Sequence, residues 1–282
     1  MVRRPFAQAG TMRRSYGLIA AAALELLALH MVLLASAMPV VRRLDLHVRD
    51  WPAQAPPMRL VLLSDLHVAV PGDSIAHLTH VVARVNALHP DLVLLAGDYL
   101  STKSYLMAPA STAQAIAPLA ALRARLGTVA VYGNHDHADR DAVAAALAAA
   151  RITLLDNRAL RRGPLAILGI SDAATGLDRE APVLAQAAAI GGVPVVLTHS
   201  PDAFAQLPGL SALLLAGHTH CGQVSFPLIG APMLDLRHGR HYGCGIVRDP
   251  TSIAVVTAGL GTSNLPIRLG APPDLWVIDI GR

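Results

Sequence analysis

Two kinds of apolar pattern divide the chain. Residues 18–41 form one apolar run of 24 residues that only Glu25, His30, Ser36 and Pro39 interrupt. Beyond residue 57, short runs rich in Val and Leu alternate with Ala-rich stretches. Continuous hydrophobicity of this kind is typical of strands that are buried on both faces and covered by helices. The pattern therefore predicts an α/β domain behind one long apolar helix.

The pattern also gives domain boundaries. We expect a basic leader over 1–17, a membrane-spanning or signal-anchor helix over 18–41, a linker over 42–57 and the main domain over 58–282. Within that domain, helices are expected over Ser74–Leu88, Ser111–Arg125, Asp139–Ala150 and Glu180–Ile190.

The apolar segment 18–41 is long enough to cross a bilayer, for which about 20 helical residues suffice. A retained, single-pass anchor in the cell membrane is the favoured interpretation, because the run is longer than a usual signal-peptide core. Two alternatives stay open. The sequence Ala35-Ser36-Ala37 would suit cleavage of a signal peptide, and a helix buried in the soluble fold is the third interpretation. Four Arg precede the segment and three follow it, which slightly favours a main domain outside the cytoplasm.

The net positive charge comes from the beginning of the chain. The formal net charge is +4, but residues 1–52 hold seven Arg against three acidic residues, and the rest of the chain is balanced. A neutral domain lacks the basic surface that polyanion binding requires, which argues against a nucleic-acid partner.

Five strand-like runs end in Asp, Asn or His, residue types that can ligate metal ions. The runs and the polar residues after them are Leu60–Leu63 with Asp65 and His67, Leu92–Leu95 with Asp98, Val129–Tyr132 with Asn134, His135 and Asp136, Val193–Leu197 with His199, and Leu213–Leu215 with His218 and His220. Ligands bind beyond the carboxyl ends of strands in open α/β sheets, so these tips should converge. Carboxylate, amide and imidazole donors suit divalent Mn, Fe or Zn. Seven such donors fit two ions that share a bridging carboxylate better than one ion.

These residues resemble the motif blocks of the calcineurin-like metallophosphoesterase family. The blocks D-x-H, G-D, G-N-H-[DE], H and G-H-x-H occur in order as SDLH at 64, GD at 97, GNHD at 133, THS at 198 and GHTH at 217. Within the family, membrane-associated phosphohydrolases with G-H-T-H-x-G-Q and G-L-G-T-S-x-L-P-x-R blocks look most similar. The corresponding stretches here are 217–223 and 259–268.

The resemblance implies a four-layer αββα sandwich and a role for each residue. Asp65, His67 and His220 would hold one metal ion, and Asn134, His199 and His218 the other, with Asp98 as the bridge. His135 would act as a non-ligand acid that Asp136 orients. Two divalent ions are implied as cofactors, with manganese favoured over iron or zinc.

Two positions depart from the family pattern. Ser101 stands where many members have a second Asp after the bridging one, and Cys221 follows GHTH where Gly is more usual. Whether Cys221 pairs with Cys244 stays open. The Gly259-x-Gly261 turn is expected to be a loop beside the site, with Arg268 as a phosphate contact.

We therefore expect an enzyme, a metallophosphoesterase that uses a metal-bridging hydroxide. Its substrate would be a phosphoester or diphosphate that is membrane-associated or lipid-linked, with UDP-diacylglucosamine as one candidate. One alternative is a phosphodiesterase for soluble phosphodiesters or nucleotides. Another is a membrane-tethered protein that binds metal or a phosphorylated ligand without turnover, although no expected donor is missing from the sequence.

Overall fold

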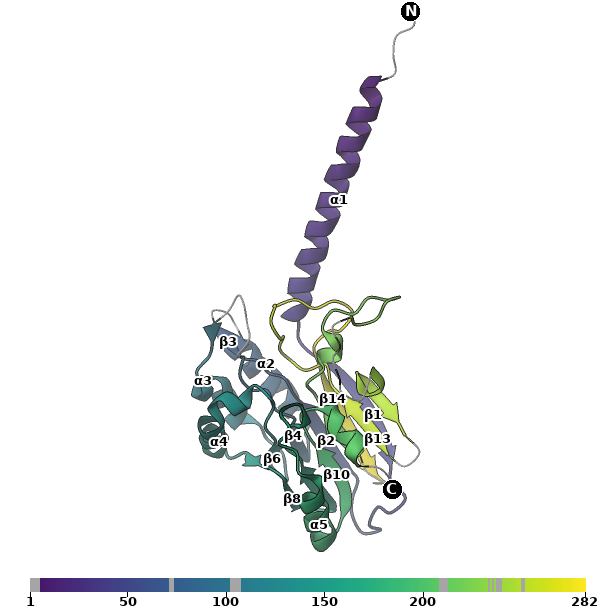
Figure 1. Ribbon diagram of the computed structural model, residues 1–282. Coiled ribbons are helices and arrows are strands. Elements are labelled where there is room, and N and C mark those ends of the chain that lie inside the picture. The colour runs from purple at the N-terminus through teal and green to yellow at the C-terminus, as the bar shows by residue number, and fades with distance from the viewer. Residues whose placement is uncertain are drawn as a thin grey trace, which may run out of the picture.

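Two six-stranded β-sheets lie face to face at the centre of the domain (Figure 1). The computed structural model describes residues 6–70, 74–101, 108–207, 213–232, 234, 236, 240–249 and 252–282. Residues 1–5 of the expected leader lie outside these described residues.

The first sheet has the strand order β1-β14-β2-β4-β6-β7. These strands are β1 (Val40–His47), β14 (Asp274–Gly281), β2 (Met58–Leu63), β4 (Leu92–Leu95), β6 (Thr128–Ala130) and β7 (Thr153–Leu154). Strands β2, β4, β6 and β7 run parallel, whereas β14 pairs antiparallel with β2 and parallel with β1.

The second sheet has the order β12-β13-β11-β10-β9-β8. Its strands are β12 (Gly245–Arg248), β13 (Ile253–Val256), β11 (Leu213–Ala216), β10 (Val193–Leu197), β9 (Leu165–Gly169) and β8 (Arg158–Arg162). The four central strands are parallel, and β8 and β12 pair antiparallel at the two edges.

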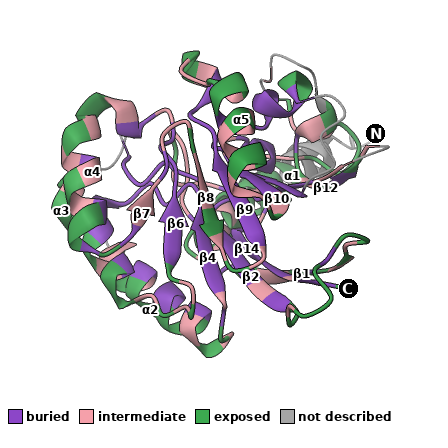
Figure 2. Cartoon of the chain, turned by 90° about the horizontal axis from the view of Figure 1, so that it is seen from below, coloured by how far each residue is buried: buried purple, intermediate pink, exposed green. Residues whose placement is uncertain are grey.

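Helices cover the outer face of each sheet (Figure 2). Helices α2 (Ser74–Ala87), α3 (Thr112–Ile116) and α4 (Arg140–Ala149) pack on the first sheet, and α5 (Glu180–Ile190) packs on the second. Short 3₁₀ turns are η1 (Ala117–Ala121), η2 (Asp136–Asp139), η3 (Ala173–Thr175), η4 (Pro201–Gln206), η5 (His220–Gly222) and η6 (Arg240–Tyr242), and a two-residue pair joins β3 (Ala69–Val70) to β5 (Ala108–Pro109).

The continuous apolar runs fill the core on both sides of each sheet. In β2, Leu60 and Leu62 point into the core between the sheets, whereas Val61 and Leu63 pack under the helices. Leu60, Val61, Leu62 and Leu63 are all fully buried. Such burial on both faces explains why these strands lack polar alternation. The predicted four-layer αββα arrangement is confirmed.

One expected helix is shorter than its apolar pattern. The prediction of a helix over Ser111–Arg125 is only partly right, since α3 ends at Ile116 and continues as the 3₁₀ turn η1. Pro118 has no N–H to donate to the preceding turn, which ends the α-helical ladder. Ser111 starts the helix with a capping box to Gln114.

The linker prediction for 42–57 is corrected by the structure. Residues 40–47 form β1, which pairs along its whole length with β14 near the other end of the chain. The Arg42 Nε donates to the buried Asp274 carboxylate at 2.6 Å, and Trp51 is buried in the core between the sheets. The segment therefore belongs to the folded domain. Its sequence VVRRLDLH looks irregular because β1 is an edge strand that is partly exposed.

Helix α1 (Phe6–Ala35) projects from one end of the domain (Figure 1). Its stretch Tyr16–Ala35 is apolar and long enough to cross a membrane by length and composition, and none of that stretch is buried in the domain. Residues 16–35 therefore do not form a helix buried within the fold, and the third interpretation of the apolar segment is wrong for this stretch. Its last turns touch the domain, where the backbone N–H of Arg268 donates to the carbonyl oxygen of Met31 at 2.9 Å.

Candidate metal centre

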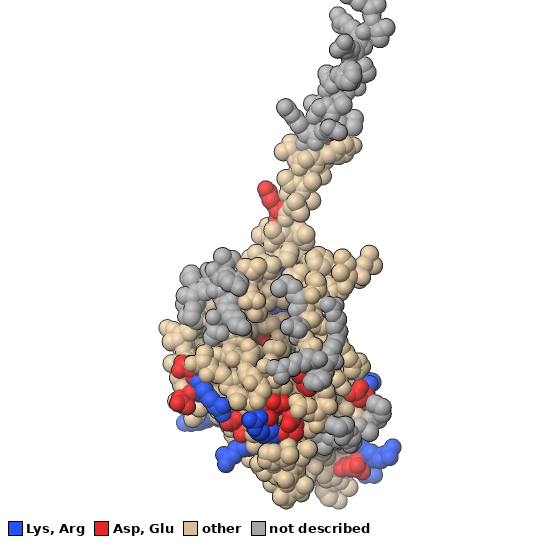
Figure 3. All heavy atoms as spheres, in the orientation of Figure 1, with Lys and Arg blue, Asp and Glu red and all other residues tan. Residues whose placement is uncertain are grey.

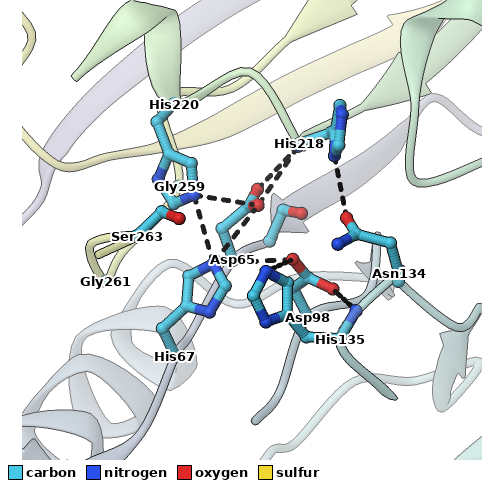
Figure 4. A network of polar contacts seen from close by, with 12 residues as sticks. Asp65, His67, Asp98, Asn134, His135, His218, His220, Gly259, Gly261 and Ser263 are labelled. Carbon is cyan, nitrogen blue, oxygen red and sulfur yellow. Dashed lines mark hydrogen bonds and ion pairs between the residues drawn. The ribbon is translucent and has the colours of Figure 1, made fainter. Parts of the chain in front are cut away.

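The structure brings all seven expected donor residues together at the carboxyl ends of the parallel strands. Figure 4 labels each of them except His199. Strands β2, β4 and β6 of the first sheet and β10 and β11 of the second lead into the loops that carry them. The donors are Asp65, His67, Asp98, Asn134, His199, His218 and His220. The two sheets therefore meet at one site, as the strand-end rule predicts.

Asp65, His67 and His220 form the first donor group. The Nε2 atoms of His67 and His220 lie 3.1 Å apart. The Asp65 Oδ1 lies 3.5 Å from the His220 Nε2 and 3.9 Å from the His67 Nε2. All three residues are buried, and their donor atoms are close enough to share one ion.

Asn134, His199 and His218 form the second donor group. The Asn134 Oδ1 lies 3.1 Å from the His199 Nε2 and 2.9 Å from the His218 Nδ1. The two imidazole nitrogens are 3.2 Å apart. Three donors thus converge on a second point, beside the first group.

Asp98 lies between the two groups. Its Oδ2 is 3.5 Å from the His67 Nε2 in the first group and 3.3 Å from the His199 Nε2 in the second. This is the placement that a bridging carboxylate requires. The donors are oxygen and imidazole nitrogen without thiolate, a set that fits a divalent ion such as Mn, Fe or Zn.

The next two residues of the GNHD block have different surroundings. The His135 ring is buried, and its Nε2 lies 4.0 Å from the Asp98 Oδ2, at the edge of the donor cluster. That Asp136 orients this ring stays a prediction, and the contacts of its carboxylate are with backbone groups. The Asp136 carboxylate accepts hydrogen bonds from the backbone N–H groups of Asp98, Tyr99 and Gly133 at 2.8–2.9 Å. Asp136 therefore joins the β4 and β6 loops.

The backbone at the site is strained. Asp65, His67, Asp98, His218 and His220 all have positive φ, between 42° and 70°. Residues other than glycine rarely adopt this region, and such conformations cluster at functional sites where the surrounding structure enforces them. The local conformation thus aims five donor side chains at one place.

Two glycines allow the β4 and β6 loops to touch. Gly97 has φ of +88°, and a Cβ there would collide with the Gly133 backbone. A Cβ on Gly133 would collide with the Asp98 carboxylate. The glycines before these donors are therefore required by the close approach of two loops.

Burial and mutual charge set the protonation of the cluster. Burial opposes ionisation of Asp98, but the neighbouring imidazoles, His199 first, outweigh it and hold the Asp98 pKa well below its usual range. Burial also opposes a charged His199, yet the Asp98 carboxylate raises the His199 pKa well above its usual value. Burial lowers the pKa of His220 to about 3, so this imidazole is neutral and its lone pair can ligate.

Arg268 lies behind the first donor group, with its Nη2 3.4 Å from the Nδ1 of His220, and its role as a phosphate contact stays a prediction. Its side chain is fully buried, and its guanidinium donates to the carbonyl oxygens of Ala258, Gly259, Gly261 and Ala271. The expected position of the Gly259-x-Gly261 turn beside the site is confirmed, because the Gly261 N–H donates to the Asp65 carbonyl oxygen at 2.7 Å. Arg268 thus fixes a loop that supports Asp65.

A disulfide joins Cys221 to Cys244 across 23 positions of sequence, with Cα atoms 4.8 Å apart. Cys221 follows the donor His220 directly, so the bond restrains the loop that carries two donors. Nearby, the Gln223 side-chain amide donates to the Ser263 and Leu265 carbonyl oxygens and accepts from the Ser263 N–H. Whether Cys221 pairs with Cys244, which the sequence leaves open, is answered by this disulfide.

Asp172 is a buried carboxylate near the site that the sequence analysis missed. It contributes to the raised pKa of His199, whereas burial and His199 lower the pKa of His218, and Asp172 offsets only part of that lowering. Its Oδ2 accepts from the Thr175 N–H, and its Oδ1 is buried without a hydrogen-bond partner among the described residues. The residue follows β9, and the rule that polar residues after buried strands converge would have found it had β9 been predicted.

A cavity of about 750 Å³ lies beside the first donor group. It is lined by His67, by Val32 and Ala35 at the end of α1, by Ala76 and His77 of α2, and by Gly261. One wall of this mostly apolar space is therefore the apolar helix, and another is a donor residue.

Comparison with known proteins decides the family. Residues 58–225 match the model of the calcineurin-like phosphoesterase superfamily domain, which is more than half of the chain. The chain belongs to the calcineurin-like phosphoesterase superfamily. Its members are hydrolases of phosphoester bonds, and both donor groups described above lie within the matched region.

Curated relatives of this phosphoesterase include membrane proteins. It is 30% identical over 259 residues to a transmembrane protein with metallophosphoesterase domain from Danio rerio, covering 84% of this chain and 56% of that one. It is 29% identical to phosphodiesterase YaeI from Escherichia coli (strain K12), covering 80% and 83% of the two chains. A crystal structure of Pseudomonas putida nuclease MPE is 18% identical, covers 77% and 86%, and has a TM-score of 0.37. The chain spans just over half the length of the Danio rerio relative.

Proposed function

We propose that this phosphoesterase hydrolyses a phosphoester or diphosphate bond in a membrane-associated or lipid-linked substrate, with two divalent ions as cofactors. The observation that carries the proposal is the cavity between His67 and the end of α1. An amphiphilic substrate would place its phosphate at the donor groups and its apolar part against Val32 and Ala35. Manganese is the favoured metal.

The residues of the site would have two functions, metal binding and proton donation. Asp65, His67 and His220 would hold one ion, Asn134, His199 and His218 the other, and Asp98 both. The bound ions would supply Lewis-acid activation of water and hold the phosphoryl oxygens. His135, whose ring lies at the edge of the cluster, would donate a proton to the leaving-group oxygen.

The domain is proposed to lie outside the cytoplasm, on a retained single-pass anchor formed by α1. The Cys221–Cys244 disulfide supports this side, because such bonds persist in oxidising compartments and are rare in the cytosol. The slight excess of Arg before the apolar segment points the same way.

The test measures metal content and hydrolysis with the full chain in detergent micelles. Rates would be compared for a lipid-linked diphosphate and for the soluble diester bis(p-nitrophenyl) phosphate. Ala76→Phe, which narrows the cavity, should lower the ratio of lipid to soluble rate by about tenfold or more. Ala83→Phe, on the exposed side of the same helix, is the matched control and should leave the ratio unchanged.

Turnover of the soluble diester with no turnover of any lipid-linked substrate would contradict the proposal and favour a soluble phosphodiester as the substrate. Bound metal without turnover of either substrate would favour a binding protein. A ratio that Ala76→Phe leaves unchanged would remove the cavity from substrate recognition.

A further inference from the structure

A closed turn beyond the donor loops carries three exposed apolar side chains. We call residues 226–230 the apolar hairpin. The N–H of Phe226 donates to the carbonyl oxygen of Gly230 at 2.8 Å, and the reverse bond from the Gly230 N–H has the same length. At its tip Leu228 is 100% exposed and Ile229 is 73% exposed, and Phe226 is 39% exposed.

Exposing these apolar side chains to water is unfavourable, which indicates that they bind an apolar partner. Single exposed apolar residues are ordinary, but a continuous exposed apolar group marks an interaction site. The sequence from Val224 to Leu234 contains no charged residue. Two backbone hydrogen bonds and Pro227 restrict the turn, so its apolar tip is held outward rather than folded back onto the domain.

The hairpin lies at the end of the domain from which α1 emerges. Its stem continues from Ser225, whose N–H donates to the carbonyl oxygen of Leu269 at 2.7 Å. The preceding residue, Arg268, donates its N–H to the Met31 carbonyl oxygen in α1. In Figure 1 the green loop beside the lower end of α1 is this segment. A short chain of backbone contacts therefore links the hairpin to the apolar helix.

The described surface around this end carries few charges. In Figure 3 the blue and red side chains of the domain gather mainly away from the lower end of α1, and the described atoms beside it are mostly neutral. Met38, Val40 and Leu265 add exposed apolar area near the helix end or on its contacting loop. Among the described residues, this weakly charged surface with a projecting apolar tip suits a lipid surface rather than a charged protein partner.

We infer that the apolar hairpin is a second membrane contact, which inserts its tip into the bilayer interface beside α1. The inference rests on the proposed membrane location of α1 and goes beyond it, because one helix alone leaves the domain free to rotate about the helix axis. Two contacts fix the orientation. Exposed apolar side chains on a restricted backbone bind the headgroup and acyl boundary by burying their area.

The test uses depth-dependent fluorescence quenching of the full chain. Leu228→Trp would be reconstituted into phosphatidylcholine vesicles with and without brominated acyl chains. The native Trp51 and Trp276 are buried, and wild-type protein supplies their background. The matched control is Ile246→Trp, at an exposed apolar position on the edge strand β12.

We expect the brominated lipid to quench the added fluorescence of Leu228→Trp several-fold more than that of Ile246→Trp, with a blue-shifted emission for the hairpin variant alone. Equal quenching of the two variants, with emission typical of water, would overturn the inference. The measurement needs no turnover. The two tests are therefore independent. Quenching can be interpreted even if no lipid substrate is hydrolysed, and the hydrolysis test can be interpreted even if the hairpin is not quenched.

Discussion

The Asp136 carboxylate accepts a hydrogen bond from the backbone N–H of Asp98 at 2.8 Å. A fully buried carboxylate thus holds the backbone of the proposed bridging residue, in the same network that binds Tyr99 and Gly133. Burial, with the charge of Asp98 as a further cause, raises the Asp136 pKa to about 7. The contacts make Asp136 a structural support of the donor loops.

Asp136→Asn should therefore destabilise the protein and weaken metal binding. An amide has one acceptor oxygen, so it leaves some of these buried N–H groups without a partner, at about 1–3 kcal/mol for each. The free energy of unfolding, measured in urea, should fall by about 2–4 kcal/mol. Asp141→Asn, an exposed change in the first turn of α4, should cost less than about 1 kcal/mol. Equal stability of the two variants would contradict the network argument.

Two variants should distinguish the residues that bind metal from the residue that donates a proton. His135→Ala should retain both ions and lower kcat by about 10²- to 10⁴-fold, because it removes only the proposed acid. Asp98→Asn should lose metal, since its carboxylate reaches both donor groups. Metal content by mass spectrometry, with initial rates on the soluble diester, tests both. A His135→Ala protein without metal would make His135 a ligand instead.

Metal uptake should release protons. The raised His199 pKa means that this imidazole holds its proton in the metal-free protein near neutral pH, because the Asp98 charge outweighs the opposing effect of burial. A ligand must be neutral, so affinity should fall as the pH falls, by about tenfold per pH unit for one displaced proton. Calorimetry of metal binding in two buffers with different ionisation enthalpies measures the number released. An enthalpy that is the same in both buffers would mean that no proton leaves.

Loss of the disulfide should lower both stability and metal content. The bond closes a loop of 23 positions, for which chain entropy gives about 3 kcal/mol. It also holds the loop of His220. The double variant Cys221→Ser with Cys244→Ser should melt at a lower temperature and bind less metal, and dithiothreitol should shift the wild-type melting curve but not the variant's. Insensitivity of the wild-type protein to the reductant would show that the bond does not contribute.

The sequence could predict those elements that depend on local residue patterns. Buried strands such as Leu92–Leu95 and the polar residues after them can be identified without a partner, and Glu180–Ile190 forms the expected helix. Strand β1 could not be identified, because Val40 pairs with Asp274 and no local sequence pattern indicates a partner so distant in the sequence.

The same limit applies to the contacts of two side chains in the site. A sequence shows the charge of Arg268 but not the four carbonyl oxygens that surround its guanidinium. It places Asp136 beside His135, yet the fold turns the carboxylate toward the loop of Asp98. In both cases the motif does not show the distant backbone groups that the side chain contacts.

The connection between α1 and the domain has a kinetic consequence. Helix α1 ends at Ala35 and β1 begins at Val40, so four residues join them, at most about 14 Å when fully extended. On an anchor this short, a membrane-bound enzyme cannot search the bulk solution for a lipid substrate. With α1 as the proposed anchor and a lipid as the proposed substrate, it would meet substrates that diffuse laterally within the same leaflet. Its rate would then follow the surface mole fraction of substrate, and diluting that lipid with an inert one would slow turnover even when the total amount of substrate is unchanged.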